Sequence, residues 1–292
     1  MGILVCESTR VIVQGITGEQ GRLHTQLMQE YGTQIVAGTS PGRGGTTMHE
    51  VPVYDTVLEA QKSHAANVSI VFVPAPFAID ATLEALEAEI KDVVVVTEHV
   101  PVKDAVDLMN YAKFVGARIV GPNTPGVITP GKCKVGILPS QEFVPGNVGI
   151  ASRSGTLTYE IAAALTRAGI GQSTCLGIGG DTVTGLNFIN ILEMFRDDPE
   201  TKAIVLIGEI GGNMEELTAQ YILDDRYPKP VVAYVAGRFA PTGKRMGHAG
   251  AIVMGKAGTA ETKIAALEAA GVRVAQTPGD VARLLAHTLR ME

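Results

Sequence analysis

The sequence predicts an α/β fold made of two doubly wound domains. Short apolar strands alternate with helical segments of about ten or more residues, which is the order of a parallel sheet covered by helices. A stretch rich in Gly and Pro at residues 121–131 interrupts this alternation, and a second series of strands and helices follows it. With 292 residues, the chain is long enough for two domains that each bury a core. We therefore predict one domain over residues 1–122 and a second over residues 123–292.

The individual elements follow from the spacing of apolar residues and from the turn residues between them. Runs rich in β-branched residues predict strands at residues 10–14, 34–38, 68–73, 92–96 and 118–120, and then at 147–151, 173–178, 203–207 and 230–235. Amphipathic stretches predict helices at residues 20–30, 56–63, 78–89, 103–115, 186–196, 214–223, 261–270 and 280–289, and one more that follows residue 156 and ends near residue 168. Residues 236–256 form a long segment of ambiguous structure, and within it residues 243–252 show neither helical nor strand periodicity.

The composition excludes several classes of protein. A formal net charge of −6 argues against a general nucleic-acid binder, which usually carries an excess of Lys and Arg. The apolar runs are shorter than the ~18–20 residues that cross a bilayer, so no membrane partner is expected. Cys6, Cys133 and Cys175 lie far apart, which provides neither a disulfide framework nor a zinc motif. We therefore expect a cytoplasmic protein without a bound metal.

The first strand-to-helix turn is a candidate anion site. Gly15, Gly18 and Gly21 follow the pattern G-x-x-G-x-x-G and not the G-x-G-x-x-G of dinucleotide-binding turns. Backbone N–H groups at a helix start attract negative charge, although a tight turn without a ligand is the alternative. After the second strand, the chain has Arg43 in the region where an NAD-binding protein would have an acidic residue. A cation there suits the phosphorylated ribose of NADP or coenzyme A, and the glycine spacing favours coenzyme A.

A second candidate anion site lies at the next strand-to-helix junction, residues 152–156. One Ser or Thr is enough to cap a helix, and a cap alone remains the alternative. Several hydroxyl groups together with a glycine exceed that need, so we predict a phosphate site at Ser154, Gly155 and Thr156. Arg153 could bind the same anion or pair with a carboxylate elsewhere.

His248 is the candidate nucleophile. It lies between small residues and directly after the cations Lys244 and Arg245. An imidazole with an unperturbed pKa of about 6.5 is largely neutral and nucleophilic at cellular pH, although an ordinary loop histidine is the alternative. Glu209 follows an apolar strand, where open α/β sheets gather their ligands. A hydrogen bond from one ring nitrogen of His248 to Glu209 would leave the other nitrogen free to attack.

The sequence contains no complete motif for binding a nucleoside triphosphate. Residues 250–257 approach the pattern G-x-x-x-x-G-K-[ST], but Ala257 replaces the hydroxyl residue that would hold magnesium. The sequence also has no G-x-S-x-G nucleophile turn and no pair of histidines at metal-binding spacing. We therefore do not expect this chain to bind ATP through such a loop.

Taken together, these segments resemble the alpha subunits of succinyl-CoA synthetase (succinate–CoA ligase) over essentially the whole chain. The most specific are Ser-Arg-Ser-Gly-Thr-Leu-Thr-Tyr-Glu at residues 152–160 and Gly-Lys-Arg-Met-Gly-His-Ala-Gly-Ala at residues 243–251. The resemblance implies an N-terminal Rossmann-like domain that binds coenzyme A and a C-terminal flavodoxin-like ligase domain. It also implies a partner beta subunit with an ATP-grasp domain, in an αβ or α2β2 complex, which binds most of the ATP or GTP and its Mg²⁺.

The resemblance further implies roles for single residues. His248 matches the histidine that is transiently phosphorylated, and Glu209 matches the carboxylate that orients it. Tyr159 falls at a position that contacts the carboxylate substrate. The helix start that holds the phosphoryl group is matched by Ser154, Gly155 and Thr156. The positions implied to contact coenzyme A are Thr17, Gly18, Glu19, Gln20, Arg43, Val96, Thr97, Glu98 and Asn123.

The implied reaction is the reversible formation of an acyl-CoA from a dicarboxylate, driven by ATP or GTP, through a phosphohistidine and an acyl phosphate. Residues 236–256 are expected to be a mobile segment that carries His248 between sites. Two residues differ from the usual family pattern: Arg43 replaces a Lys, and Thr124 replaces a Cys close to where coenzyme A reacts. A malate–CoA or citrate–CoA ligase subunit is therefore an alternative. An NADP-dependent oxidoreductase or a non-catalytic coenzyme A-binding module would leave His248 and Glu209 without a role.

Overall fold

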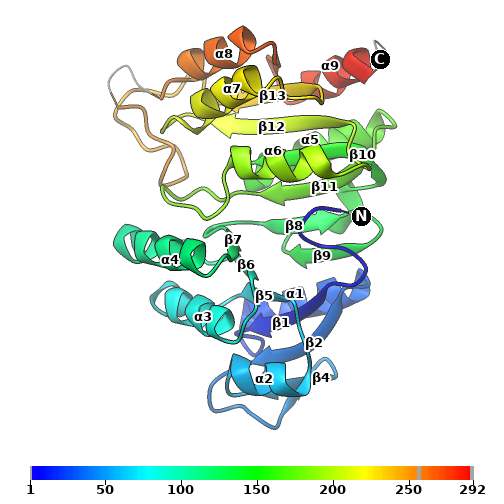
Figure 1. Cartoon of the computed structure of the whole chain (residues 1–292), viewed down its shortest axis with the longest axis vertical. Helices are drawn as coiled ribbons and strands as arrows, with labels where there is room; N and C mark the ends of the chain where they lie inside the picture. The colour runs from blue at the N-terminus through cyan, green and yellow to red at the C-terminus, as the bar shows by residue number, and fades with distance from the viewer. Residues whose placement is uncertain (1, 255–257, 290–292) are drawn as a thin grey trace.

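The computed structural model describes residues 2–254 and 258–289. Within this part of the chain, the strands form two seven-stranded sheets. The two sheets lie one above the other along the long axis of the molecule, with helices packed against them (Figure 1). The α/β fold expected from the sequence is confirmed. The near match to a phosphate-binding loop at residues 250–257 falls partly outside the described residues.

The first sheet has the strand order β3-β4-β2-β1-β5-β6-β7. Its strands are β1 (Arg10–Gln14), β2 (Gln34–Thr39), β3 (Thr47–Met48), β4 (Val51–Tyr54), β5 (Val68–Val71), β6 (Asp92–Val95) and β7 (Arg118–Val120). Its helices are α1 (Glu19–Glu30), α2 (Val57–Ser63), α3 (Ala75–Glu87) and α4 (Val102–Phe114). Every pair of neighbouring strands is parallel except β3 with β4. All strands and helices predicted for this half are present, with small shifts at their ends.

The antiparallel pair β3–β4 was not expected from the sequence. β3 has only two residues, and β4 contains Pro52 among its four. Proline donates no hydrogen bond to a neighbouring strand, so its presence argues against a strand in the interior of a sheet. The pair lies at the edge of the first sheet, where proline is tolerated.

The second sheet has the strand order β14-β13-β12-β10-β11-β8-β9. Its strands are β8 (Gly126–Thr129), β9 (Cys133–Gly136), β10 (Pro145–Ser152), β11 (Gln172–Gly177), β12 (Ala203–Glu209), β13 (Val231–Ala236) and β14 (Arg273–Ala275). Its helices are α5 (Gly155–Arg167), α6 (Phe188–Asp197), α7 (Met214–Asp224), α8 (Ala260–Ala269) and α9 (Asp280–Leu289), with a 3-10 turn at Ser140–Glu142. The four strands and five helices predicted for this half are all present.

The hairpin β8–β9 adds an antiparallel edge to the second sheet and was not expected. The strands β8 and β9 pair with each other, and β8 also pairs antiparallel with β11. Gly126 and Gly136 lie opposite each other in this hairpin, at φ +95° and +141°. A Cβ on Gly126 would lie 2.2 Å from the carbonyl oxygen of Val135, so the two backbones can approach only because glycine is present. Gly126 therefore belongs to a strand pair, although it lies in the Gly- and Pro-rich stretch in which the sequence indicated only a break in the alternation of strands and helices.

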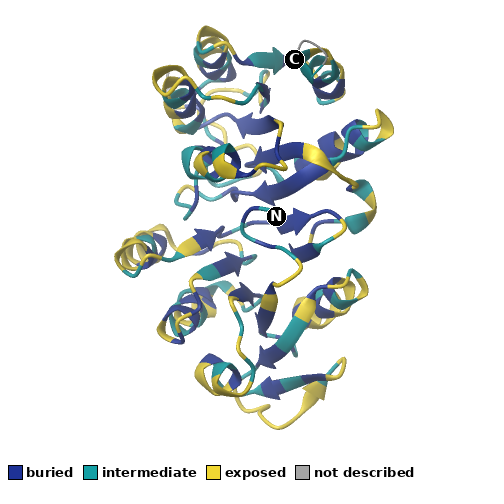
Figure 2. Ribbon diagram, turned by 45° about the vertical axis from the view of Figure 1, so that its right-hand side comes forward, coloured by how far each residue is buried: buried dark blue, intermediate teal, exposed yellow. Residues whose placement is uncertain are grey.

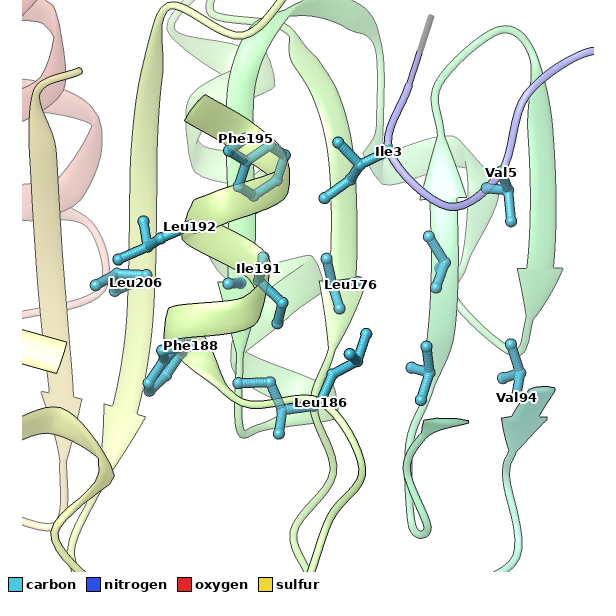
Figure 3. Close-up of a cluster of buried hydrophobic side chains, with 14 of the residues drawn as sticks. Ile3, Val5, Val94, Leu176, Leu186, Phe188, Ile191, Leu192, Phe195 and Leu206 are labelled. Atoms are coloured by element: carbon cyan, nitrogen blue, oxygen red, sulfur yellow. The ribbon is translucent and has the colours of Figure 1, made fainter. Parts of the chain in front are cut away.

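Among the described residues, the buried apolar side chains form three clusters, and the largest reaches from the second sheet to the first. Phe188, Leu192 and Phe195 of α6 pack toward Leu206 of β12 in this cluster, and Val94 of β6 belongs to it as well (Figure 3). The strands of both sheets are largely buried, while the outer faces of the helices are exposed (Figure 2). In the described part of the chain, no helix combines the length and apolar character needed to cross a bilayer.

The segment before β1 also joins the two halves of the molecule. The backbone N–H of Ile3 donates to Oγ1 of Thr174 at 3.2 Å, and Oγ1 of Thr129 donates to the carbonyl oxygen of Val5 at 2.8 Å. Ile3 and Val5 are buried beside the second sheet (Figure 3). The chain therefore contacts the second sheet before it enters the first. The change of sheet occurs between β7 and β8, and the domain boundary at residues 122/123 remains a prediction.

Candidate active site

His248 and Glu209 are in direct contact. Glu209 is the last residue of β12, and its Oε2 atom lies 2.8 Å from Nδ1 of His248. A carboxylate only accepts hydrogen bonds, so Nδ1 carries a proton and the lone pair of the neutral ring is on Nε2. The structure thus places the two residues that the sequence singled out separately in contact. Nε2 of His248 remains as the nitrogen that can act as a nucleophile.

The electrostatic surroundings of His248 are unusual for a loop histidine. The hydrogen bond to Glu209 raises the pKa of His248 above its ordinary value, against the opposing effects of burial and of the Arg153 cation. Asp181 raises this pKa further. The side chain of Glu209 is only 8% exposed, and its second oxygen, Oε1, lies 3.4 Å from Nη2 of Arg153. The imidazole is therefore part of a charged group of residues at the end of β12.

The segment that carries His248 lies against the end of the second sheet. Residues 237–254, which the sequence left ambiguous, contain no helix and only isolated bridges. The N–H of Gly250 donates to the carbonyl oxygen of Gly180 at 3.2 Å. A Cβ on Gly211, which has φ +89°, would lie 1.9 Å from the carbonyl oxygen of Gly250. Glycines on both sides therefore allow the backbone of this segment to approach β12. Its mobility remains a prediction.

The start of α5 contributes to the same site. Ser154 is the N-cap of the helix, and its side-chain oxygen accepts the N–H of Leu157 at 3.3 Å. Gly155 and Thr156 are the first helical residues, and both line a cavity together with His248. The first N–H groups of a helix have no partner within the helix and attract anions. Ser154 thus serves as a cap, while the adjoining backbone is suited to a phosphate.

This cavity has a volume of about 690 Å³ and extends from His248 to the carboxyl ends of β5 and β6. It lies where the two halves of the chain meet. The predicted site residues that line it are Gln20, Val96, Thr97, Glu98, Asn123, Gly155, Thr156 and His248. The lining residues to which the sequence analysis gave no role are Phe72, Val73, Pro74, Ala75, His99, Pro125 and Ile137. Most of these residues are apolar. Because apolar residues near strand ends are also typical of an ordinary core, the sequence does not show that they line a cavity.

Four of the positions predicted to contact coenzyme A lie away from the lining of this cavity: Thr17, Gly18, Glu19 and Arg43. The hydroxyl groups of Thr17 and Ser40 are 2.6 Å apart and join the turn after β1 to the loop after β2, which also holds the exposed Arg43. Gly18 is the N-cap of α1, and no side chain caps this helix. Gln20, in the first turn of α1, does line the cavity, so the helix start borders it.

Thr124 forms part of the loop that leads from the first sheet to the second. Its Oγ1 atom donates to the carbonyl oxygen of Gly177 at 2.6 Å and accepts the N–H of Gly126 at 3.0 Å. The next residue toward the first sheet, Asn123, donates through Nδ2 to Oδ1 of Asp181 at 3.0 Å. A thiol is a weaker donor than a hydroxyl, so the threonine that departs from the family pattern holds this loop firmly.

Two further expectations concern Tyr159 and metal ions. Tyr159 lies in the second turn of α5, is 36% exposed, and does not line the cavity that contains His248. Its role in binding substrate remains a prediction. Within residues 2–254 and 258–289, no group of three or more His, Cys, Asp or Glu side chains is arranged to hold a metal ion.

Comparisons with known proteins match both halves of the chain. A CoA binding domain model matches residues 6–99, and a CoA-ligase model matches residues 151–273. The ADP-forming succinate–CoA ligase subunit alpha 2 of Archaeoglobus fulgidus is 58% identical over 289 residues, which cover 99% of this chain and 100% of that protein. The corresponding alpha subunit of Aquifex aeolicus is 54% identical and covers 100% of this chain and 96% of its own length.

Solved structures give the same picture at lower identity. ATP citrate lyase from Methanothrix soehngenii, in complex with citrate and coenzyme A, superimposes with a TM-score of 0.90 at 27% identity over 99% of this chain. The present chain spans about half of that protein, 51% of its length. An acetyl-coenzyme A synthetase from Ca. Korarchaeum cryptofilum shares the fold, with a TM-score of 0.75 at 19% identity over 94% of this chain and 60% of its own. Identities of 54–58% over nearly the full length decide the assignment: the chain belongs to the family of succinate–CoA ligase alpha subunits.

Proposed function

We propose that this protein is the histidine-bearing subunit of an acid–CoA ligase that converts succinate, coenzyme A and ATP to succinyl-CoA, ADP and phosphate, and that also runs in reverse. The observation that carries the proposal is the hydrogen bond between Glu209 and Nδ1 of His248 at the mouth of a cavity that reaches the first sheet. The membership of the chain in the succinate–CoA ligase alpha family supports it.

In the first step, Nε2 of His248 attacks the γ-phosphorus of a nucleoside triphosphate, and the bond to the β-phosphate oxygen breaks. Glu209 accepts the hydrogen bond from Nδ1–H, so it stabilises the positive charge that develops on the ring. The N–H groups at the start of α5 lie beside the same cavity as His248 and balance the charge of the phosphoryl group. Lys244 and Arg245 are nearby in sequence and add positive charge.

In the second step, a carboxylate oxygen of the acid attacks the phosphorus, the bond to Nε2 breaks, and an acyl phosphate forms. In the third step, the thiolate of coenzyme A attacks the acyl carbon and phosphate leaves. The histidine thus divides one difficult transfer into easier ones. We assign Tyr159 to the side of α5 that receives the carboxylate substrate, because it follows the phosphate-binding helix start by one turn.

Coenzyme A fits the first half of the chain. No side chain caps the start of α1, so the N–H groups of its first turn, from Glu19 on, can bind the phosphates of coenzyme A beside Thr17 and Gly18. Arg43 adds a cation on the neighbouring loop. Gln20, Val96, Thr97, Glu98 and Asn123 line the cavity through which the thiol would reach His248. A CoA binding domain model matches residues 6–99, which contain all but one of these positions.

The chain requires a partner for the nucleotide. We propose a beta subunit with an ATP-grasp domain that binds ATP and Mg²⁺, in an αβ or α2β2 complex in the cytoplasm. ATP is favoured over GTP because the alpha subunits compared above are named ADP-forming. We also propose the boundary between the coenzyme A domain and the ligase domain at residues 122/123, next to the change of sheet.

The test is a coupled assay of the chain co-expressed with its partner, using ATP, coenzyme A and a panel of succinate, malate and citrate. We expect acyl-CoA formation with succinate, and its loss in a His248→Asp variant that still assembles. Turnover by that variant at the wild-type rate would refute the role of His248. Thr124 and the likeness to a citrate-binding lyase favour citrate as the second candidate acid, and preferential turnover of citrate would replace succinate in the proposal.

A further inference from the structure

Three charged side chains behind Glu209 have no part in the steps described above. Arg153, Glu215 and Lys263 have side chains that are 6%, 3% and 0% exposed. Glu215 lies between the two cations: its Oε1 atom is 3.0 Å from Nη1 of Arg153, and its Oε2 atom accepts a short hydrogen bond from Nζ of Lys263. Burial of such charges costs free energy, and ion pairs of this kind often add little net stability. Their other contacts are therefore informative.

Arg153 and Glu215 both bind the backbone of Glu209. The N–H of Glu209 donates to Oε1 of Glu215 at 3.1 Å, and its carbonyl oxygen accepts from Nη1 of Arg153 at 3.2 Å. The same Nη1 donates to the carbonyl oxygen of Gly211 at 3.1 Å. Both backbone groups of the residue that holds His248 are thus bound by side chains, which fixes the backbone from which its carboxylate reaches the imidazole.

Lys263 holds the other end of this turn. Its Nζ atom donates to the carbonyl oxygen of Gly212 at 3.1 Å and lies 3.2 Å from Oε2 of Glu216. Lys263 belongs to α8, whereas Glu215 and Glu216 belong to α7. Side chains from α7, from α8 and from the residue that follows β10 therefore all contact the backbone at the end of β12 or directly after it.

The charges in this group are balanced. Burial acts to raise the pKa of Glu215, but Arg153 and Lys263 outweigh it and the pKa falls below its ordinary value. Two cations, Arg153 and Lys263, thus face two buried anions, Glu209 and Glu215. Arg153 by itself lowers the pKa of His248. Removal of the charge of Glu215 or of Lys263 therefore changes the net electrostatic effect of this group on the pKa of His248.

We propose that Arg153, Glu215 and Lys263 are positioning residues for the transfer to His248. They hold the backbone of Glu209 in place and balance its surroundings, so that its carboxylate binds Nδ1–H and leaves Nε2 for the phosphoryl group. The inference rests on the proposed function of His248, and it assigns a role to three residues that touch neither substrate nor phosphate.

The test measures the proton affinity of His248 by NMR titration of the labelled full-length chain, with a His248→Gln variant to assign the signal. The charged groups around His248 are Glu209 on β12, Arg153 before α5 and Asp181 after β11, with Lys244 and Arg245 on its own segment. We expect Glu215→Gln to lower the pKa of His248, because Arg153 loses a compensating anion. We expect Lys263→Met to raise it, because a cation is removed. If the two substitutions only loosened the contact between Glu209 and His248, both would lower the pKa of His248.

The second part of the test measures phosphorylation rates in the complex of this chain with its partner subunit. Each single variant should slow phosphorylation of His248 by roughly tenfold or more. The KM for the acid and for coenzyme A should not change, because the three residues touch neither ligand. In the double variant Glu215→Gln/Lys263→Met, one charge of each sign is removed. Its pKa for His248 should return toward that of the wild type, and its loss of rate should be smaller than the product of the two single effects.

The controls are Lys132→Met and Glu200→Gln, which remove the same types of charge from an ion pair of 2.9 Å on the surface. Neither should change the pKa of His248 or the rate. The inference is overturned if Glu215→Gln and Lys263→Met fold but leave both quantities as in the wild type, or if both shift the pKa in the same direction. If a single variant does not fold, the double variant decides: a folded double variant that phosphorylates His248 at the wild-type rate contradicts the proposal. Failure of the wild-type chain to accept a phosphoryl group would instead refute the proposed function.

Discussion

Gly180 and His248 lie so close together that a side chain at position 180 would collide with the imidazole. A Cβ on Gly180 would be 2.5 Å from Cγ and 2.8 Å from Nδ1 of the imidazole, distances that real Cβ contacts essentially never show. The carbonyl oxygen of Gly180 also accepts the N–H of Gly250, two residues beyond the histidine. The ring therefore rests on the backbone of the loop after β11, and this loop sets its position relative to Glu209.

We predict that Gly180→Ala displaces the imidazole and slows its phosphorylation by about tenfold or more, equivalent to about 1.4 kcal/mol in the barrier. The rate of phosphoryl incorporation, measured in the complex with its partner, tests this. Gly279→Ala is the matched control, because the nearest atom to its Cβ would be 3.9 Å away and the rate should not change. Equal rates for the wild type and Gly180→Ala would show that the ring does not depend on this contact.

Glu209→Gln should lower the pKa of His248, since the hydrogen bond to the carboxylate is the main cause of its increase. A group whose pKa is raised on folding stabilises the protein fully below its unfolded pKa, and this contribution is lost as the pH rises through the folded pKa. The wild type should therefore exceed the variant in unfolding free energy by more at about pH 6 than at about pH 9. Urea unfolding at both pH values measures the difference, and a gap that grows with pH would contradict the assignment.

Thr124→Val should destabilise the chain by about 1–3 kcal/mol, because the buried carbonyl oxygen of Gly177 and the N–H of Gly126 each lose a partner. Thr124→Ser keeps the hydroxyl group and should lose much less. Urea unfolding of both variants provides the comparison. A larger loss for Thr124→Ser than for Thr124→Val would indicate that the methyl group, and not the hydroxyl, holds this loop.

Ser154→Ala removes the side-chain cap of α5 and should destabilise the protein by about 1 kcal/mol. Thr259 caps α8 in the same way, by accepting the N–H of Thr262 at 3.2 Å, so Thr259→Ala should lose a similar amount. Only Ser154→Ala should also slow phosphorylation of His248, because only α5 starts beside it. If both variants react at equal rates, the start of α5 does not act on the phosphoryl group.

The sequence predicted the fold class and the long elements well because their signals are local. Apolar runs such as Ala203–Glu209 and amphipathic stretches such as Asp280–Leu289 show their periodicity within a few residues. The hairpin β8–β9 was missed because Gly126 and Gly136 are typical of turns, and their role in a close backbone pair depends on distant neighbours. The same holds for β4, in which Pro52 masked a strand that lies next to the edge of the sheet.

The candidate site could be predicted only in part. His248 and Glu209 stand out by their sequence context, yet their contact joins residues 39 positions apart and needed the structure. The ion pairs of Arg153 with Glu215, and of Glu215 with Lys263, join residues 62 and 48 positions apart, and no local pattern links them. Lys263 in particular looks like an exposed helical lysine in the sequence, whereas its side chain is completely buried.

The most direct test of the account is to determine which nitrogen of His248 carries the phosphoryl group. The complex is phosphorylated with its nucleoside triphosphate, and the phosphohistidine isomer is identified by ³¹P NMR and by mapping the modified peptide. Because Glu209 binds Nδ1–H, the account predicts a single acid-labile phosphoryl group on Nε2 of His248. A phosphoryl group on Nδ1, or on any residue other than His248, would contradict it.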